Sequence, residues 1–153
     1  MPKTDDLSLI VLKGHLLIEE RLFGLAELAL PHPQYLKRIR NLPFSTLAYF
    51  VRAAVREKSN HACWELIPAL NSLRNDYAHK LEPPDLQKHL QKLFQIDRRI
   101  ETYPTQPVDK SPSSGLTDAE RLRYVIIDCM TFLSTLEFDY SKRQSVTVLR
   151  AIK

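Results

Sequence analysis

Apolar residues recur at intervals of three and four through most of this chain, the spacing that places them on one face of an α-helix. The pattern predicts helices over residues 5–30, 45–57, 61–80, 86–101 and 117–136. Nine of the ten prolines lie outside these segments, and only Pro68 lies within one. Because proline breaks helices, this distribution supports the boundaries. We therefore expect an all-α fold, a helical bundle of about five helices that opens with a long N-terminal helix.

Side chains that cap helices stand at several of the predicted starts. Thr4 or Asp5 can cap the first helix and Ser45 the second, since their side-chain oxygens accept hydrogen bonds from free backbone N–H groups. Thr117 and Glu120 have the spacing of a capping box at the start of the last helix. These residues predict where three of the helices begin.

The length of the chain, 153 residues, suits one domain with a substantial core. Residues 102–115 are rich in proline and serine, which predicts a mobile loop within a single helical domain over residues 1–138. Residues 139–153 are expected to form a short basic C-terminal tail. The pattern leaves open whether the end of this tail is a short strand or a final turn of helix.

The net charge of +4 permits a nucleic-acid partner without requiring one. Most of this charge lies in the tail, where a single acid, Asp139, is outnumbered by four basic residues: Lys142, Arg143, Arg150 and Lys153. These cations are candidates for contact with an RNA backbone. The alternative is a tail that is solvated or docked on a partner.

Other features of the composition narrow the range of functions. Three glycines leave no phosphate-binding loop. Cys63 and Cys129 are far apart and lack metal-ligand spacing, which is typical of small core residues in a reducing compartment. The acidic N-terminus does not resemble a signal peptide, and no segment has the length and apolarity of a membrane span. We expect no cofactor, no metal, no membrane association and a cytoplasmic protein.

The segment RNDYAH, from Arg74 to His79, carries the strongest candidate chemistry. A guanidinium stabilises charge on phosphoryl oxygens and an imidazole transfers protons near neutral pH, so Arg74 and His79 suit metal-free cleavage of RNA. Asn75 lies one helical turn before His79 and can orient it, whereas Arg74 converges on His79 only where the helix ends. One histidine cannot easily act as both acid and base, but two copies in a symmetric dimer would supply both groups. The alternative is structural: Arg74 pairs with an acid of another helix, and His79 stabilises a helix C-terminus.

The first predicted helix holds polar residues that could support RNDYAH. Glu19 or Glu20 is expected to be buried among leucines, where a carboxylate needs a partner. We expect an ion pair between this helix and Arg74, which would orient the guanidinium. His15 and Glu19 share a helix face, but their spacing alone is a weak metal signal.

The stretch from Leu70 to His79 resembles the signature of the HEPN superfamily, an arginine, commonly followed by asparagine, with a histidine four to six residues later. With the segment from Gly14 to Leu22, GHLLIEERL, it looks most like the branch that contains the mannitol operon repressor family. The resemblance implies an RNA-binding homodimer that brings the motifs together and, in many members, metal-independent endoribonuclease activity. Arg74 and His79 would then be the catalytic pair and Asn75 an accessory group.

The resemblance also implies alternatives. An antitoxin or other protein partner is typical of HEPN toxins, but these often place a tyrosine two residues after the histidine, where this chain has Leu81. Members that resemble the mannitol repressor are described as regulators. A non-catalytic regulatory or protein-interaction module is therefore the alternative function.

Overall fold

The computed structural model describes residues 6–39, 41–55, 58–79, 85–100, 109–111 and 115–151, with the side chains of Lys37 and residues 143–151 excepted. The elements are α1 (Leu7–Ala29), the 3₁₀-helix η1 (Pro33–Arg38), α2 (Phe44–Ala54), α3 (Cys63–His79), α4 (Leu86–Asp97) and α5 (Asp118–Ala151). The described residues contain no strand. The predicted all-α fold with five main helices is therefore confirmed.

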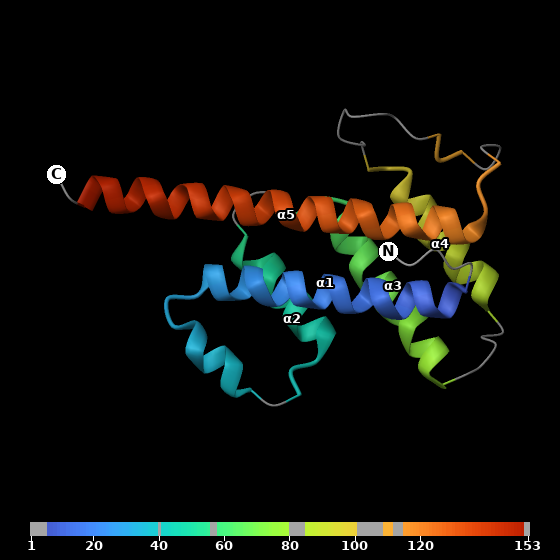
Figure 1. Cartoon of the computed structure of the whole chain (residues 1–153), viewed down its shortest axis with the longest axis horizontal. Helices are drawn as coiled ribbons and strands as arrows, with labels where there is room; N and C mark the ends of the chain where they lie inside the picture. Colours follow the sequence, from blue (N-terminus) through green and yellow to red (C-terminus); the bar gives the residue numbers. More distant parts are fainter. Residues whose placement is uncertain are drawn as a thin grey trace.

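Two long helices, α1 and α5, lie side by side and run in the same direction (Figure 1). They pack tightly at Gly14, where a Cβ atom would lie 2.3 Å from Cδ1 of Ile126. Farther along, Arg21 Nη1 donates a hydrogen bond of 2.7 Å to Glu137 Oε2. The missing side chain of Gly14 thus lets the two backbones approach, and the ion pair fixes their register.

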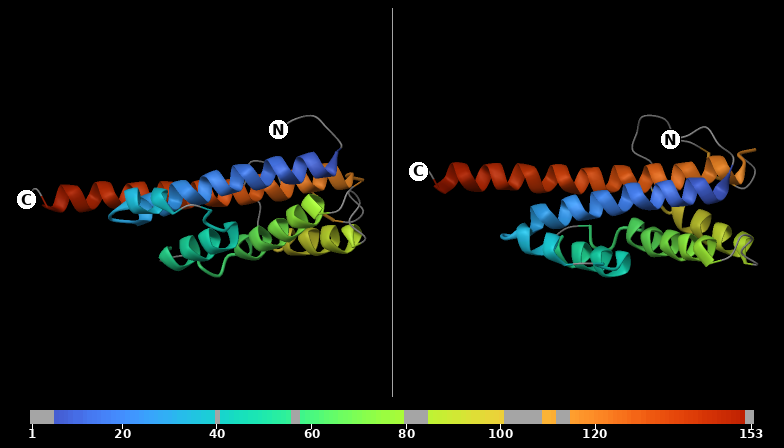
Figure 2. Two further views of the ribbon diagram at one scale, coloured as in Figure 1. Left: turned by 90° about the horizontal axis from the view of Figure 1, so that it is seen from below. Right: turned by 60° about the horizontal axis from the view of Figure 1, so that its bottom comes forward.

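The other three helices form a second layer against this pair (Figure 2). The α3 helix runs antiparallel to α1, since Asn71 bonds to His15 and Tyr77, farther along α3, lies near Asp6, which precedes α1. Burial raises the pKa of the Tyr77 phenol, and the charge of Asp6 also raises it. All five helices contribute to one apolar core, whose fully buried side chains include Ile18, Leu22, Leu47, Leu70, Leu93 and Phe132. Burial of this surface holds the helices together.

The capping predictions succeeded at one of the three starts. Thr117 and Glu120 form the capping box: each side chain accepts a hydrogen bond from the other's backbone N–H, at 2.8 and 3.2 Å. Asp6 caps α1 and accepts from two backbone N–H groups, while Thr4 and Asp5, the predicted caps, lie outside the described residues. The cap predicted at Ser45 is wrong, since α2 begins at Phe44, directly after Pro43.

The last helix is longer than the hydrophobic pattern predicted. Residues 139–151 continue α5 without a break, so the described part of the basic tail is helical and not a strand. Its first turn is attached to the bundle, since Asp139 pairs with Lys58 at 3.1 Å and the Tyr140 hydroxyl donates to the Ala54 carbonyl. None of the helices described combines the length and apolar character that crossing a bilayer requires.

Candidate functional site

RNDYAH forms the last turns of α3, at the end of the bundle where α1 and α5 begin (Figure 1). Leu70 and Leu73 anchor this part of the helix in the core, and Tyr77 is half-buried beside them. Arg74 is half-buried, while Asn75 and His79 are exposed. The apolar residues therefore hold α3 in place, and the polar residues of the motif lie on the sides of the helix that the core does not cover.

Arg74 and Asn75 are in contact. The guanidinium donates from Nη1 to Oδ1 of Asn75 at 3.2 Å, and no carboxylate of the described residues forms an ion pair with it. The predicted ion pair with Glu19 or Glu20 is therefore wrong. Glu20 is exposed to solvent and Glu19 is only half-buried, so neither carboxylate needs a buried cation.

His79 is the last residue of α3, and its side chain is exposed. It makes no hydrogen bond with Arg74 or Asn75 in the part of the chain that the structure describes. Asn75 lies one turn earlier on neighbouring surface of the same helix. The structure thus joins two of the three predicted catalytic residues and places the third at the open end of their helix.

His15 lies beneath the motif and is 5% exposed. Its Nε2 is 3.0 Å from Asn71 Oδ1, and its ring packs on Phe44 with centroids 4.1 Å apart. Burial lowers the pKa of His15, and the charge of Arg74 also lowers it, while Asn71 and Glu19 act in the opposite direction. A neutral imidazole that donates to Asn71 fits these surroundings. His15 thus fastens α1 to α3 one turn before Asn75 and is closed to a substrate.

A second histidine, His89, reaches the motif from α4. Its Nδ1 is 2.8 Å from Oδ2 of Asp76, which is close enough for an ion pair. The angle between the two groups, however, does not fit a hydrogen bond. The side chains of His89 and Asp76 are 32% and 28% exposed. Asp76 and His79 are three residues apart and so neighbours on α3. Sequence spacing could not reveal His89, because it depends on how α4 packs on α3.

The described part of the basic tail lies at the opposite end of the molecule from the motif (Figure 1). Lys142 is exposed, with its Nζ 4.3 Å from the centre of the Phe138 ring. Arg143 and Arg150 belong to α5, and Lys153 lies outside the described residues. The tail and RNDYAH therefore cannot contact the same nucleotide.

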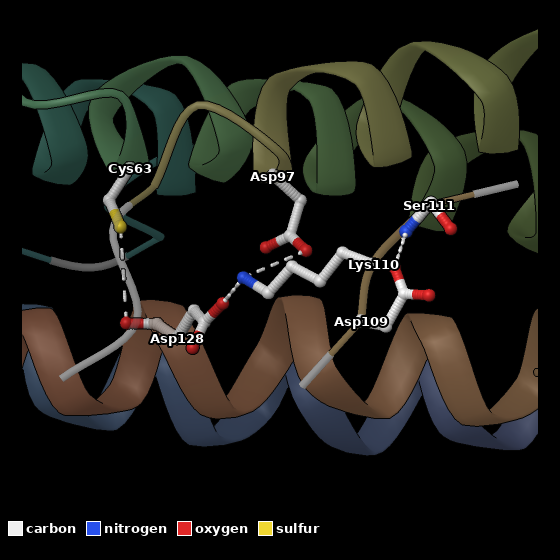
Figure 3. Close-up of polar contacts among 6 residues, drawn as sticks. All are labelled: Cys63, Asp97, Asp109, Lys110, Ser111 and Asp128. Atoms are coloured by element: carbon white, nitrogen blue, oxygen red, sulfur yellow. Dashed lines mark hydrogen bonds and ion pairs between the residues drawn. The ribbon is translucent and has the colours of Figure 1, made fainter. Parts of the chain in front are cut away.

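A second polar cluster lies between α4 and α5, in the interior (Figure 3). Lys110 bonds to Asp128 and lies 3.2 Å from Oδ2 of Asp97, so this residue of the predicted loop is anchored. Asp97 is 3% exposed, and its Oδ1 has no hydrogen-bond partner. Burial, helped by the charge of Asp128, raises the pKa of Asp97 to about 6 despite the lowering effect of Lys110. Burial lowers the pKa of Lys110, but its bonds with the two carboxylates leave that pKa raised overall.

Within the described residues, no three histidine, cysteine, aspartate or glutamate side chains gather as a metal site would require. Comparison of the chain with family models, with curated proteins and with solved structures found no match. The resemblance of RNDYAH to the HEPN signature therefore stays a prediction.

Proposed function

We propose that the protein is a HEPN-like RNA-binding protein that cleaves RNA without a metal, at the surface formed by Arg74, Asn75 and His79. The observation that carries the proposal is the state of Arg74, whose guanidinium has no carboxylate partner among the described residues. A cation that the described part of the fold does not neutralise is available to a phosphate, and the planar guanidinium suits two phosphoryl oxygens at once.

In the proposed reaction Arg74 binds the scissile phosphate and stabilises the charge that grows on its oxygens. His79 accepts the proton of the 2′-hydroxyl, and the 2′-oxygen attacks the adjacent phosphorus. The bond from phosphorus to the 5′-oxygen breaks, leaving a 2′,3′-cyclic phosphate and a 5′-hydroxyl. His89, which lies 2.8 Å from Asp76, donates the proton that the leaving oxygen takes up. This assignment lets one copy supply both the acid and the base.

A regulatory or protein-interaction module is the second candidate function. It is favoured by an open groove between α1 and α5, with a volume of about 560 Å³ and a lining that includes Leu17, Ile127 and Phe138. Apolar side chains left exposed on a shallow surface are typical of sites for protein partners. In this function RNDYAH would contribute to the fold alone.

The two functions separate in a cleavage assay in EDTA with single-stranded and structured RNA. We expect the wild type to cut RNA, and Arg74→Ala or His79→Ala to cut about a hundredfold more slowly or worse. The matched controls are Arg38→Ala, in η1, and His32→Ala, directly before η1. Both residues are exposed, and both variants should cut RNA at the wild-type rate. Intact RNA with the wild type, or equal cutting by the motif variants, would exclude the nuclease function.

A further inference from the structure

The exposed side of α4 differs in composition from the exposed sides of α1 and α2. In residues 86–100 every exposed side chain is a glutamine or a base, and the bases are Lys88, Lys92, Arg98 and Arg99. No acid and no apolar residue is exposed in this range. By contrast, α1 exposes Leu16 and Glu20, and α2 exposes Tyr49 and Phe50. We call the four bases the basic face of α4.

The spacing of these side chains makes the basic face a continuous row. Lys88, Lys92, Gln95 and Arg99 follow one another by four, three and four residues, which keeps them on one side of α4 and of the turn after it. At 1.5 Å per residue the row is about 16 Å long. The amide of Gln95 thus lies between cations and can donate hydrogen bonds alongside them.

Most of the charge on the basic face is not neutralised by the described part of the chain. Arg99 pairs with Glu65 of α3. The other three bases form no ion pair with any acid that the structure describes. The acid of α4 itself, Asp97, is buried and faces Lys110 in the interior, and Asp85 is exposed directly before the helix. The face therefore attracts anions.

The basic face begins beside RNDYAH. The α3 and α4 helices lie side by side and run antiparallel (Figure 2), since Asp76 pairs with His89 at one end and Glu65 with Arg99 at the other. His89 precedes Lys92 by one helical turn, so the two side chains are neighbours on α4. A strand bound at the end of α3 can therefore continue from His89 onto the basic face.

The composition of the face favours the backbone of a nucleic acid over other anionic partners. Lysine, arginine and glutamine side chains supply most contacts to phosphates. A membrane-binding helix would also present apolar residues to the lipid, and a protein interface would have an apolar or aromatic centre. The exposed side of α4 has neither.

We infer that the basic face of α4 binds the backbone of the RNA strand that RNDYAH holds. Lys88 and Lys92 contact the phosphates nearest the candidate site, and Arg98 and Arg99 contact those farther along. The inference rests on the RNA binding proposed above, but not on cleavage. It assigns the phosphate contacts to α4 and not to the basic tail.

The first test measures the binding of a fluorescent, fully 2′-O-methylated single strand by anisotropy in EDTA, over a range of salt concentrations. The proposed reaction cannot cut this strand. The double variant Lys88→Gln, Lys92→Gln should flatten the slope of log Kd against log salt by about 1.4, since each phosphate contact to a single strand contributes about 0.7. Its affinity at low salt should fall about tenfold or more. Both lysines are exposed, so the variant should fold, which thermal unfolding checks.

The matched control removes the same charge elsewhere, with Lys13→Gln and Lys142→Gln together. Both lysines are exposed, on α1 and α5. Lys13 lies two residues before His15, which faces α3, and so on the opposite side of α1. This control should keep the wild-type affinity and salt slope. An equal loss in the control, or no loss in the α4 variant, would overturn the inference.

The second test locates the bound strand by acetylation of lysines, read by mass spectrometry with and without the same RNA. Lys88 and Lys92 should react several times more slowly when RNA is bound, whereas Lys13 and Lys142 should react at an unchanged rate. Protection of Lys142 without protection of the α4 lysines would place the strand on the tail and overturn the inference.

The inference and the proposed cleavage fail in different ways. If the strand binds to α4 but unmodified RNA stays intact, cleavage is excluded and the inference stands. If RNA is cut, and the double variant binds and cuts it as the wild type does, the inference is wrong and cleavage stands. A wild type that binds no RNA at all excludes both.

Discussion

The two polar clusters of this protein, RNDYAH at the end of α3 and Asp97–Lys110–Asp128 between α4 and α5, differ in what the fold has done with their charges. In the interior, Lys110 lies between two carboxylates, and the group serves to join a loop to two helices. At the end of α3, Arg74 hydrogen-bonds to a neutral amide and has no ion-pair partner in the described chain, and His79 is open to solvent. Charged groups that pair with one another inside the fold support the structure, whereas a charged group without an ion-pair partner can bind a ligand.

The largest expected effect comes from breaking the interior cluster with Lys110→Met. The buried carboxylate of Asp97 and the half-buried carboxylate of Asp128 would then lack their cation. We expect a loss of about 3 kcal/mol in the free energy of unfolding at neutral pH, because an unpaired buried charge is costly. The loss should shrink in acid, where Asp97 takes up a proton. Urea titrations at two pH values measure it, with Lys13→Met, an exposed lysine, as the control that stays within about 0.5 kcal/mol.

Cleavage of RNA by Lys110→Met should remain at the wild-type rate wherever the variant is folded. A loss of cleavage as large as that of His79→Ala would mean that the interior cluster belongs to the site. The division between the two clusters would then be wrong.

Replacing the buried acid gives a smaller effect whose sign depends on pH. The folded pKa of Asp97, about 6, is above its ordinary value of 3.8. The folded state therefore binds more protons between these pH values, and the stability that Asp97 contributes is lost as the pH rises through about 6. Relative to Asp97→Asn, the wild type should lose about 2 kcal/mol across this window.

The matched control for this pH dependence is Asp109→Asn. Asp109 is exposed beside the same lysine, and hydrogen bonds from Ser111 lower its pKa. Its contribution should therefore weaken as the pH falls, opposite in sign to that of Asp97. If the difference between the wild type and Asp97→Asn did not change with pH, the buried acid would not titrate in this range.

The smallest of the three effects comes from the contact between His15 and Asn71, one helical turn before the start of RNDYAH. Asn71→Ala removes the partner of the buried His15 nitrogen, which should cost about 1 kcal/mol of unfolding free energy. It should also lower the pKa of His15 further, since the bond to Asn71 raises it. Thermal unfolding and the NMR titration of the imidazole check both results. Ser72→Ala is the control, because Ser72 is exposed and its hydroxyl bonds within α3; an equal loss there would implicate the helix rather than His15.

The sequence was a good guide to structure that depends on local spacing. The five helical segments follow from apolar periodicity, and the Thr117 capping box follows from two residues three apart. The pattern left open whether the end of the basic tail is a strand or a turn of helix. The structure continues α5 to Ala151, since neither proline nor glycine interrupts the chain beyond Gly115. The short helix η1 was missed because it has no amphipathic period. Arg74 and Asn75 could be selected from their motif. Their partners could not, because the contacts of Glu19 and His89 depend on how separate helices pack.

The ends of the RNA fragments released in EDTA give the sharpest test of cleavage by Arg74 and His79. An RNA and its fully 2′-O-methylated counterpart are incubated with the wild type and with His79→Ala. We expect the wild type to cut only the unmodified RNA and to leave 2′,3′-cyclic phosphate and 5′-hydroxyl ends, while His79→Ala cuts that RNA about a hundredfold more slowly or worse. Cutting of the methylated strand, or equal cutting by His79→Ala, would contradict the role assigned to the open end of α3.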